Sequence, residues 1–110
     1  MPVLLPRPAF IAAVNERIDW LAEHRGEEQL EHFLNGLAAV RSRIEQSPAA
    51  GPPVKRSDTH VLRMRLFSRP LPYLVYYGHR VEQRLTEIYL IRLYGSGQEH
   101  EIFEMSDWPW

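Results

Sequence analysis

The chain has 110 residues, of which 45% are hydrophobic, and its formal net charge is −1. This length accommodates one hydrophobic core, so we expect residues 1–110 to form a single domain. The absence of cysteine excludes disulfides, thiolate metal sites and cysteine nucleophiles, and the nearly neutral charge disfavours a general nucleic-acid binder.

The N-terminal part predicts a short strand followed by a helix. Prolines at positions 2, 6 and 8 leave space for an edge strand at residues 3–5 at most. Four apolar residues then recur at the spacing of one helix face, namely Phe10, Val14, Ile18 and Leu21. Pro8 is tolerated in the first turn of such a helix and Gly26 is suited to end it.

A second helix is predicted within residues 27–48, with Pro48 beyond its end. Its apolar positions have the same period, with acids near its start and arginines toward its end, as the helix dipole prefers. Because only Gly26 and its neighbours separate the two helices, we expect an antiparallel hairpin whose shared apolar face needs a further layer.

The following segment, residues 47–58, contains four prolines and glycines close together and predicts a loop. Beyond it the apolar period becomes two, and strands are predicted in "HVLRMRLFS", "LPYLVYYG" and "TEIYLIRLYG". In the first of these, Leu62 and Met64 alternate with Arg63 and Arg65, which indicates one buried face and one face that carries arginines.

Helices followed by strands indicate an α+β fold. We expect an N-terminal helical hairpin, after a short edge strand, packed on a small curved antiparallel sheet. Residues 95–110 follow as an acidic, aromatic tail.

Charge is strongly segregated along the chain. Residues 54–94 contain eight basic and three acidic side chains, whereas residues 95–110 contain four acids and neither lysine nor arginine. Four arginines of the predicted strands and turns form a candidate target-binding patch if they point to one side: Arg63, Arg65, Arg69 and Arg92. The alternative is that each of them belongs to the solvated face of a half-buried sheet.

Metal-independent RNA cleavage would need a base, a cation for the phosphorane and an acid for the leaving oxygen. His60 or His79 are candidates for proton transfer, Arg65 or Arg69 for the cation and Tyr94 for a proton donor. Each histidine is isolated in its own stretch, which is more often unremarkable than catalytic. The histidine spacing suits no metal site and no glycine-rich phosphate loop occurs, so we expect neither a metal nor a cofactor.

The tail "EIFEMSDWPW" alternates acids with apolar and aromatic residues. Such a segment can fold back over the basic sheet or dock on a partner. The alternative is that it only covers an open edge of the sheet.

The order of elements, together with short motifs, resembles the RelE/ParE superfamily of bacterial toxins, the stable halves of type II toxin–antitoxin modules. The matching pieces are Trp20 in "IDWLAEH", the helix end "IEQSPAAG", the strands "LRMRLF" and "PYLVYY", and the final strand "IYLIRLYGSG". The resemblance covers about residues 3–97 and implies the α+β fold described above.

Two departures distinguish the branches of this superfamily. The ribosome-dependent messenger-cleaving branch keeps an arginine before Leu-Val-Tyr of the middle strand, where this sequence has Tyr73. It also carries basic residues near its C-terminus, where this sequence has "GSGQEHEIFE". The resemblance therefore favours the ParE-like branch, which inhibits DNA gyrase and thereby replication by binding.

Two alternatives stay open. The first is an mRNA interferase that uses Arg63, Arg65, Arg69 and Tyr94. The second is an inactive family member that acts as an interaction protein.

The resemblance also implies a cognate antitoxin whose C-terminal segment wraps the helical hairpin and the sheet edge. Residues expected to contact it are Phe10, Val14, Trp20, Leu37, Trp108 and Trp110. The chain would arrest growth, stabilise plasmids and form a homodimer or a hetero-oligomer with its antitoxin. Because it shows neither the pattern of a secretory signal nor an apolar run of roughly 18 residues, we expect a cytoplasmic protein without membrane contact.

Overall fold

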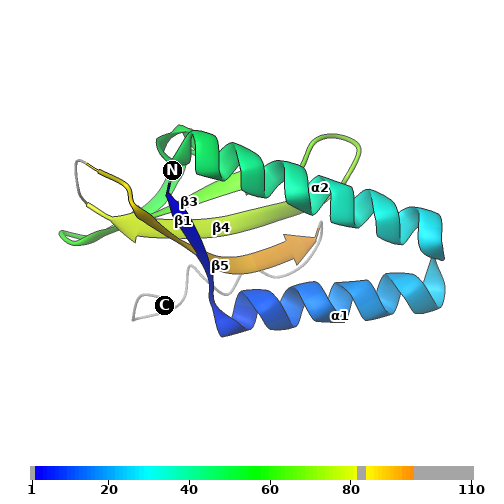
Figure 1. The fold of residues 1–110 in the computed structure, drawn as a ribbon. Helices are drawn as coiled ribbons and strands as arrows, with labels where there is room; N and C mark the ends of the chain where they lie inside the picture. The colour runs from blue at the N-terminus through cyan, green and yellow to red at the C-terminus, as the bar shows by residue number, and fades with distance from the viewer. Residues whose placement is uncertain (1, 82–83, 96–110) are drawn as a thin grey trace.

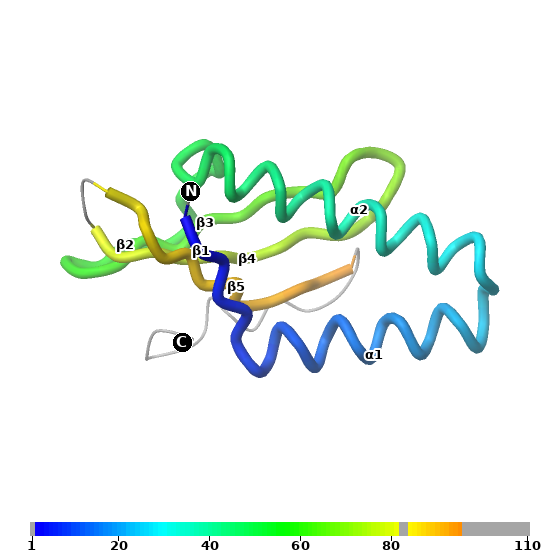
Figure 2. Tube along the Cα trace, in the orientation of Figure 1, coloured from blue at the N-terminus to red at the C-terminus, as the bar shows by residue number. Residues whose placement is uncertain are grey.

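The structure, a computed structural model, describes residues 2–81 and 84–95. Its elements in chain order are β1 (Val3–Pro6), α1 (Pro8–His24), α2 (Glu27–Gln46), the 3₁₀ turn η1 (Pro48–Ala50), β2 (Pro53–Arg56), β3 (His60–Leu66), β4 (Tyr73–Arg80) and β5 (Glu87–Gly95). The two helices form an antiparallel hairpin whose turn projects beyond the ends of β4 and β5 (Figures 1 and 2). The predicted α+β class with its helical hairpin and curved sheet is confirmed.

The helix boundaries follow from local chemistry. Pro8 stands at the first position of α1, where its missing N–H is not needed. At the other end, the Gly26 N–H donates to the Leu21 carbonyl at 3.0 Å. Gly26 has a φ of +86°, which side-chain-bearing residues rarely adopt, so the turn between the helices depends on it.

The sheet differs from the prediction in two respects. Its order is β1-β5-β4-β3-β2, and β1 runs parallel to β5, with Val3 opposite Glu87. The sheet is therefore mixed. Along the chain, two helices lie between β1 and the remaining strands. In addition, β2 lies inside residues 47–58, where a loop was predicted, and that part of the prediction is wrong. Pro53 is the first residue of an edge strand, a position where proline is tolerated.

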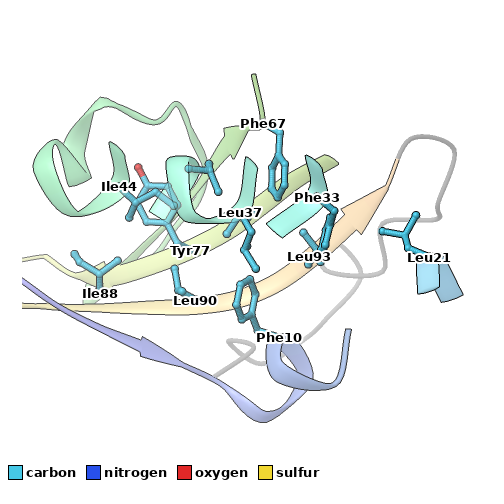
Figure 3. Packing of buried hydrophobic residues seen from close by; sticks show 12 residues of the cluster. Phe10, Leu21, Phe33, Leu37, Ile44, Phe67, Tyr77, Ile88, Leu90 and Leu93 are labelled. Carbon is cyan, nitrogen blue, oxygen red and sulfur yellow. The ribbon is translucent and has the colours of Figure 1, made fainter. Parts of the chain in front are cut away.

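The main core lies between the helices and one face of the sheet. It joins Phe10 and Leu21 of α1, four residues of α2 and alternate residues of β4 and β5. Figure 3 shows Phe10, Leu37 and Leu90 near its centre. This face of the sheet, the helix face, is thereby withdrawn from water.

The opposite face, the second face, carries its own cluster. Leu62, Tyr76 and Ile91 are buried there, and five half-buried residues surround them, namely Val54, Met64, Leu74, Tyr89 and Tyr94. None of these eight residues comes from α1 or α2. Successive strand residues alternate between faces, so Arg63 and Arg65 of β3 lie on the helix face. The sequence pattern had indicated one buried face and one face that carries arginines. Both faces of β3 therefore contribute to buried structure.

A bulge in β5 adjusts this alternation. Tyr76 is opposite Arg92 and Tyr77 is opposite Leu90, so Ile91 is the extra residue of β5. Because a bulge lets two successive residues oppose one, Ile91 and Arg92 both accompany Tyr76 on the second face. The bulge thus decides where Arg92 lies.

Candidate functional site

A polar cluster on the helix face holds η1 and the residue after it against the sheet. The Tyr77 hydroxyl donates to the Pro48 carbonyl at 2.6 Å and accepts from the Gly51 N–H at 3.2 Å. Tyr77 is wholly buried, and its phenol pKa is raised, chiefly by burial. The hydroxyl therefore stays protonated and serves as a fixed link between β4 and η1.

Arg63 completes this cluster. Its Nε donates to Nε2 of His79 at 3.0 Å, and its NH1 donates to the Ala49 and Gly51 carbonyls at 3.1 and 2.8 Å. One side chain thus joins β3, β4 and the η1 turn. Arg63 is oriented inward by these three bonds, which makes it primarily a structural residue.

His79 is buried and has both ring nitrogens in hydrogen bonds. Because Nε2 accepts from Arg63, Nδ1 carries the proton and donates to the Arg80 carbonyl at 2.8 Å. Burial lowers the pKa of His79, the guanidinium groups of Arg63 and Arg56 lower it further, and the bond to Arg80 opposes them. The imidazole is therefore neutral at neutral pH, with neither nitrogen available as a base.

This depressed pKa predicts a pH dependence of stability. Below the ordinary histidine value of 6.5 the unfolded chain binds a proton at His79 more readily than the folded chain does, so the free energy of unfolding falls as the pH decreases. We expect urea midpoints to be higher at about pH 8 than at about pH 5.5. His60, whose pKa is also lowered, chiefly by burial, contributes in the same direction.

The control for this prediction is His79→Gln, which removes the titrating group. Its midpoint is expected to depend less on pH over the same interval, whatever its absolute stability. An equal pH dependence in both proteins would contradict a neutral, buried His79.

The structure does not bring the four arginines of the predicted patch together. Arg63 and Arg65 lie on the helix face, opposite Tyr77 and Val75, whereas Arg92 lies on the second face opposite Tyr76. Arg69 is exposed in the connection between β3 and β4. The Nε of Arg65 is buried and has no hydrogen-bond partner among residues 2–81 and 84–95.

The residues considered for RNA cleavage are dispersed in the same way. Tyr94 belongs to the second face, where its ring meets that of Tyr76 edge-on at 5.7 Å. Arg63 and His79 are on the other side of the sheet and bound to each other. These groups therefore do not surround a common point at which a phosphate could react.

The predicted antitoxin contacts on the helices line a shallow groove. Phe10 and Val14 of α1 and Leu37 of α2 line it, together with the exposed Ile11, and its volume is about 120 Å³. Phe10 and Leu37 are themselves core residues, 2% and 8% exposed. They can form only the floor of a binding surface.

Trp20 stands apart from this groove, near the end of α1. It is 38% exposed, and the guanidinium carbons of Arg17 and Arg25 lie 5.2 and 5.4 Å from its ring centre. His24 stacks on it with ring centres 4.9 Å apart. Trp20 and Tyr73 also line a cavity of about 390 Å³ between α1 and the ends of β4 and β5. Glu16 also lines this cavity. The surface at Trp20 itself is aromatic and cationic, which suits an acidic or aromatic ligand group.

Three other expectations concern the tail tryptophans, metal binding and membrane contact. Trp108 and Trp110 lie outside the residues that the structure describes. Within residues 2–81 and 84–95, no three His, Asp or Glu side chains are placed to share a metal ion. None of the helices in that part of the chain combines the length and the apolar character needed to cross a membrane.

The polar cluster of Tyr77, His79 and Arg63 was not predicted as a unit. His79 was considered as an isolated histidine, and Arg63 as a member of an arginine patch. The available signal was a histidine and a tyrosine two positions apart in an otherwise apolar strand, since such groups need hydrogen-bond partners when buried.

No protein-family model and no curated protein sequence matches the chain. A solved structure does match, described as "Chromosomal ParDE TA system from P. aeruginosa", with a TM-score of 0.64 and 18% sequence identity. The match covers 86% of this chain and 96% of that chain. The two chains therefore share a fold, as the sequence resemblance implied.

Proposed function

We propose that this chain is the toxin of a type II toxin–antitoxin module, that it inhibits DNA gyrase by binding, and that a cognate antitoxin neutralises it. The observation that carries the proposal is the fold shared with the ParDE chain over 86% of the residues. The sequence departures from the messenger-cleaving branch also favour the ParE-like branch of the superfamily.

The positions of the polar side chains favour binding over RNA cleavage. His79 is neutral with both nitrogens bonded, and Arg63 is held by His79 and two carbonyls. Tyr94 is on the opposite face of the sheet. A base, a cation and an acid drawn from these residues would not act on one phosphate.

Target binding would use the arginines that remain from the predicted patch. Arg69 is exposed beyond β3, and Arg65 and Arg92 are half-buried on opposite faces. We assign target contact first to Arg69 and then to Arg65, and assign Arg63 a supporting role because it fixes the strand that carries Arg65. Such arginines suit an acidic surface on the target.

Antitoxin binding is assigned to the groove between α1 and α2 and to the Trp20 surface. Phe10, Val14 and Leu37 offer an apolar floor, and Arg17 and Arg25 flank Trp20 with positive charge. An antitoxin segment with apolar anchors and acidic residues would match both. Trp108 and Trp110 remain proposed contacts on the basis of the sequence.

Controlled expression of the chain in a bacterial host tests the proposal. We expect growth arrest with relaxed plasmid DNA and intact transcripts, because inhibited gyrase no longer introduces negative supercoils. Co-expression of the cognate antitoxin should restore growth. Cut transcripts would contradict the gyrase assignment and favour the mRNA interferase, and normal growth of cells that contain folded protein would favour an interaction protein.

A matched pair of variants tests the antitoxin surface in the same assay. Ile11 is exposed beside the groove and Leu66 is exposed at the end of β3. We expect Ile11→Glu to remain toxic but to resist rescue, since a charge in the groove weakens binding by about 1–3 kcal/mol. Leu66→Glu should remain toxic and be rescued.

A further inference from the structure

The cluster on the second face is more completely buried than the positions of the described helices explain. Leu62, Tyr76 and Ile91 are 0%, 1% and 0% exposed, although both helices pack on the other face. In a sheet covered by helices on one side only, central residues of the open side keep contact with water. Within residues 2–81 and 84–95, the half-buried hydrophobic side chains packed against these three residues all come from strands of the sheet.

Residues 96–110 have the composition of such a covering. They continue from Gly95, the last residue of β5, and contain five apolar or aromatic side chains, namely Ile102, Phe103, Met105, Trp108 and Trp110. Five half-buried apolar or aromatic residues surround the buried cluster. Burial of the two sets against each other would withdraw both from water.

The length of the segment suffices. Fifteen residues span up to about 50 Å when extended, whereas crossing from β5 over β4 to β3 takes roughly 10 Å. Even Ile102, seven residues beyond Gly95, can reach the side of the sheet on which Leu62 lies.

The charges are complementary as well. Lys55 is opposite Leu62, and Arg92 is opposite Tyr76, so both belong to the second face. Arg80, four positions after Tyr76 in β4, shares that face by alternation. The tail carries four acids, Glu99, Glu101, Glu104 and Asp107, and neither lysine nor arginine. The acids of the tail, which lie between its apolar residues, can thus pair with the cations that surround the buried cluster of the second face.

We infer that residues 96–110 dock on the second face of the sheet in the same molecule, with aromatic side chains over Leu62, Tyr76 and Ile91 and acids toward Lys55, Arg80 and Arg92. This inference goes beyond the proposed function and does not depend on it.

Tryptophan fluorescence of the full-length chain tests the docking. Of the three tryptophans, Trp20 is replaced in a Trp20→Phe background, so that only the two tail residues report. We expect acrylamide to quench Trp108 and Trp110 severalfold less than in a synthetic peptide of residues 96–110, because docked rings are shielded from solvent. Quenching equal to that of the peptide would overturn the inference.

A pair of leucine variants locates the docked tail. Leu74 is half-buried on the second face, and Leu34 is 41% exposed on α2. In the Trp20→Phe background, Leu74→Glu should raise the quenching constant at least about twofold by repelling the acidic tail, and Leu34→Glu should leave it unchanged. Circular dichroism confirms that each variant is folded. An equal response to both variants would place the tail elsewhere.

A second pair covers the case in which Leu74→Glu fails to fold. Arg92→Glu reverses a charge on the second face, and Arg41→Glu does so beside the helix groove. Only the first should raise the quenching. Sedimentation at the same protein concentrations shows whether the chain is a monomer or a dimer. If the tail tryptophans were protected from acrylamide only at concentrations that yield dimers, a second copy would cover the face. That result would overturn intramolecular docking.

Discussion

Gly51→Ala is expected to lower the free energy of unfolding by about 3 kcal/mol. A β-carbon at this position would lie 2.6 Å from the Met64 carbonyl oxygen and would also collide with the Tyr77 hydroxyl. The first obstacle is backbone of β3 and cannot rotate away. The substitution would also disturb the bonds from Gly51 to Tyr77 and Arg63. Urea denaturation followed by circular dichroism measures the loss.

Gly26→Ala is the matched control, because it replaces a glycine that is required by its backbone conformation and not by close packing. No heavy atom lies within 4 Å of a β-carbon there, but φ is +86°. Backbone strain alone should cost about 1 kcal/mol. If both substitutions destabilised the chain equally, close packing at Gly51 would not be the cause.

Arg63→Ala should destabilise the chain by a similar amount, about 3 kcal/mol. The change removes three donated hydrogen bonds at once and leaves Nε2 of the buried His79 without its partner. Arg63→Lys should recover part of the loss, since an ammonium group cannot reproduce the planar arrangement of guanidinium donors. Thermal and urea unfolding of the purified variants provide the measurement.

Arg69→Ala is the control for Arg63→Ala. Arg69 is exposed, and its removal should change stability by less than about 0.5 kcal/mol. The contrast matters for any assay of toxicity. Inactivity of the Arg63→Ala variant could result from lost structure as readily as from lost contact with the target. Comparable stabilities of Arg63→Ala and Arg69→Ala would contradict the structural role of Arg63.

The helices and the central strands could be predicted because their apolar periods are local. Residues 47–58 misled the prediction, since prolines and glycines usually mark loops. The strand at Pro53–Arg56 depends on pairing with β3, and a pairing between segments is not visible in either segment alone. The parallel pairing of β1 with β5 has the same origin.

The candidate site was harder to predict for two physical reasons. Arg63 is held by the carbonyls of Ala49 and Gly51 and by His79, which lie 12 to 16 positions away in the sequence. A simple alternation assigns β3 its faces correctly but cannot say which face the helices cover. In β5 the extra residue Ile91 shifts the alternation, so that Arg92 lies on a different face from Arg63.

The pairing of β1 with β5 also orders the events of synthesis and folding. Val3 finds its partner Glu87 only after nearly all intervening residues have been translated, whereas the helical hairpin and the β3–β4 pair need neighbours close in sequence. Closing so long a loop is entropically expensive and slows folding. The N-terminal segment therefore stays unpaired while the rest of the chain emerges from the ribosome, and β1 joins the edge of the sheet after β5 has been made.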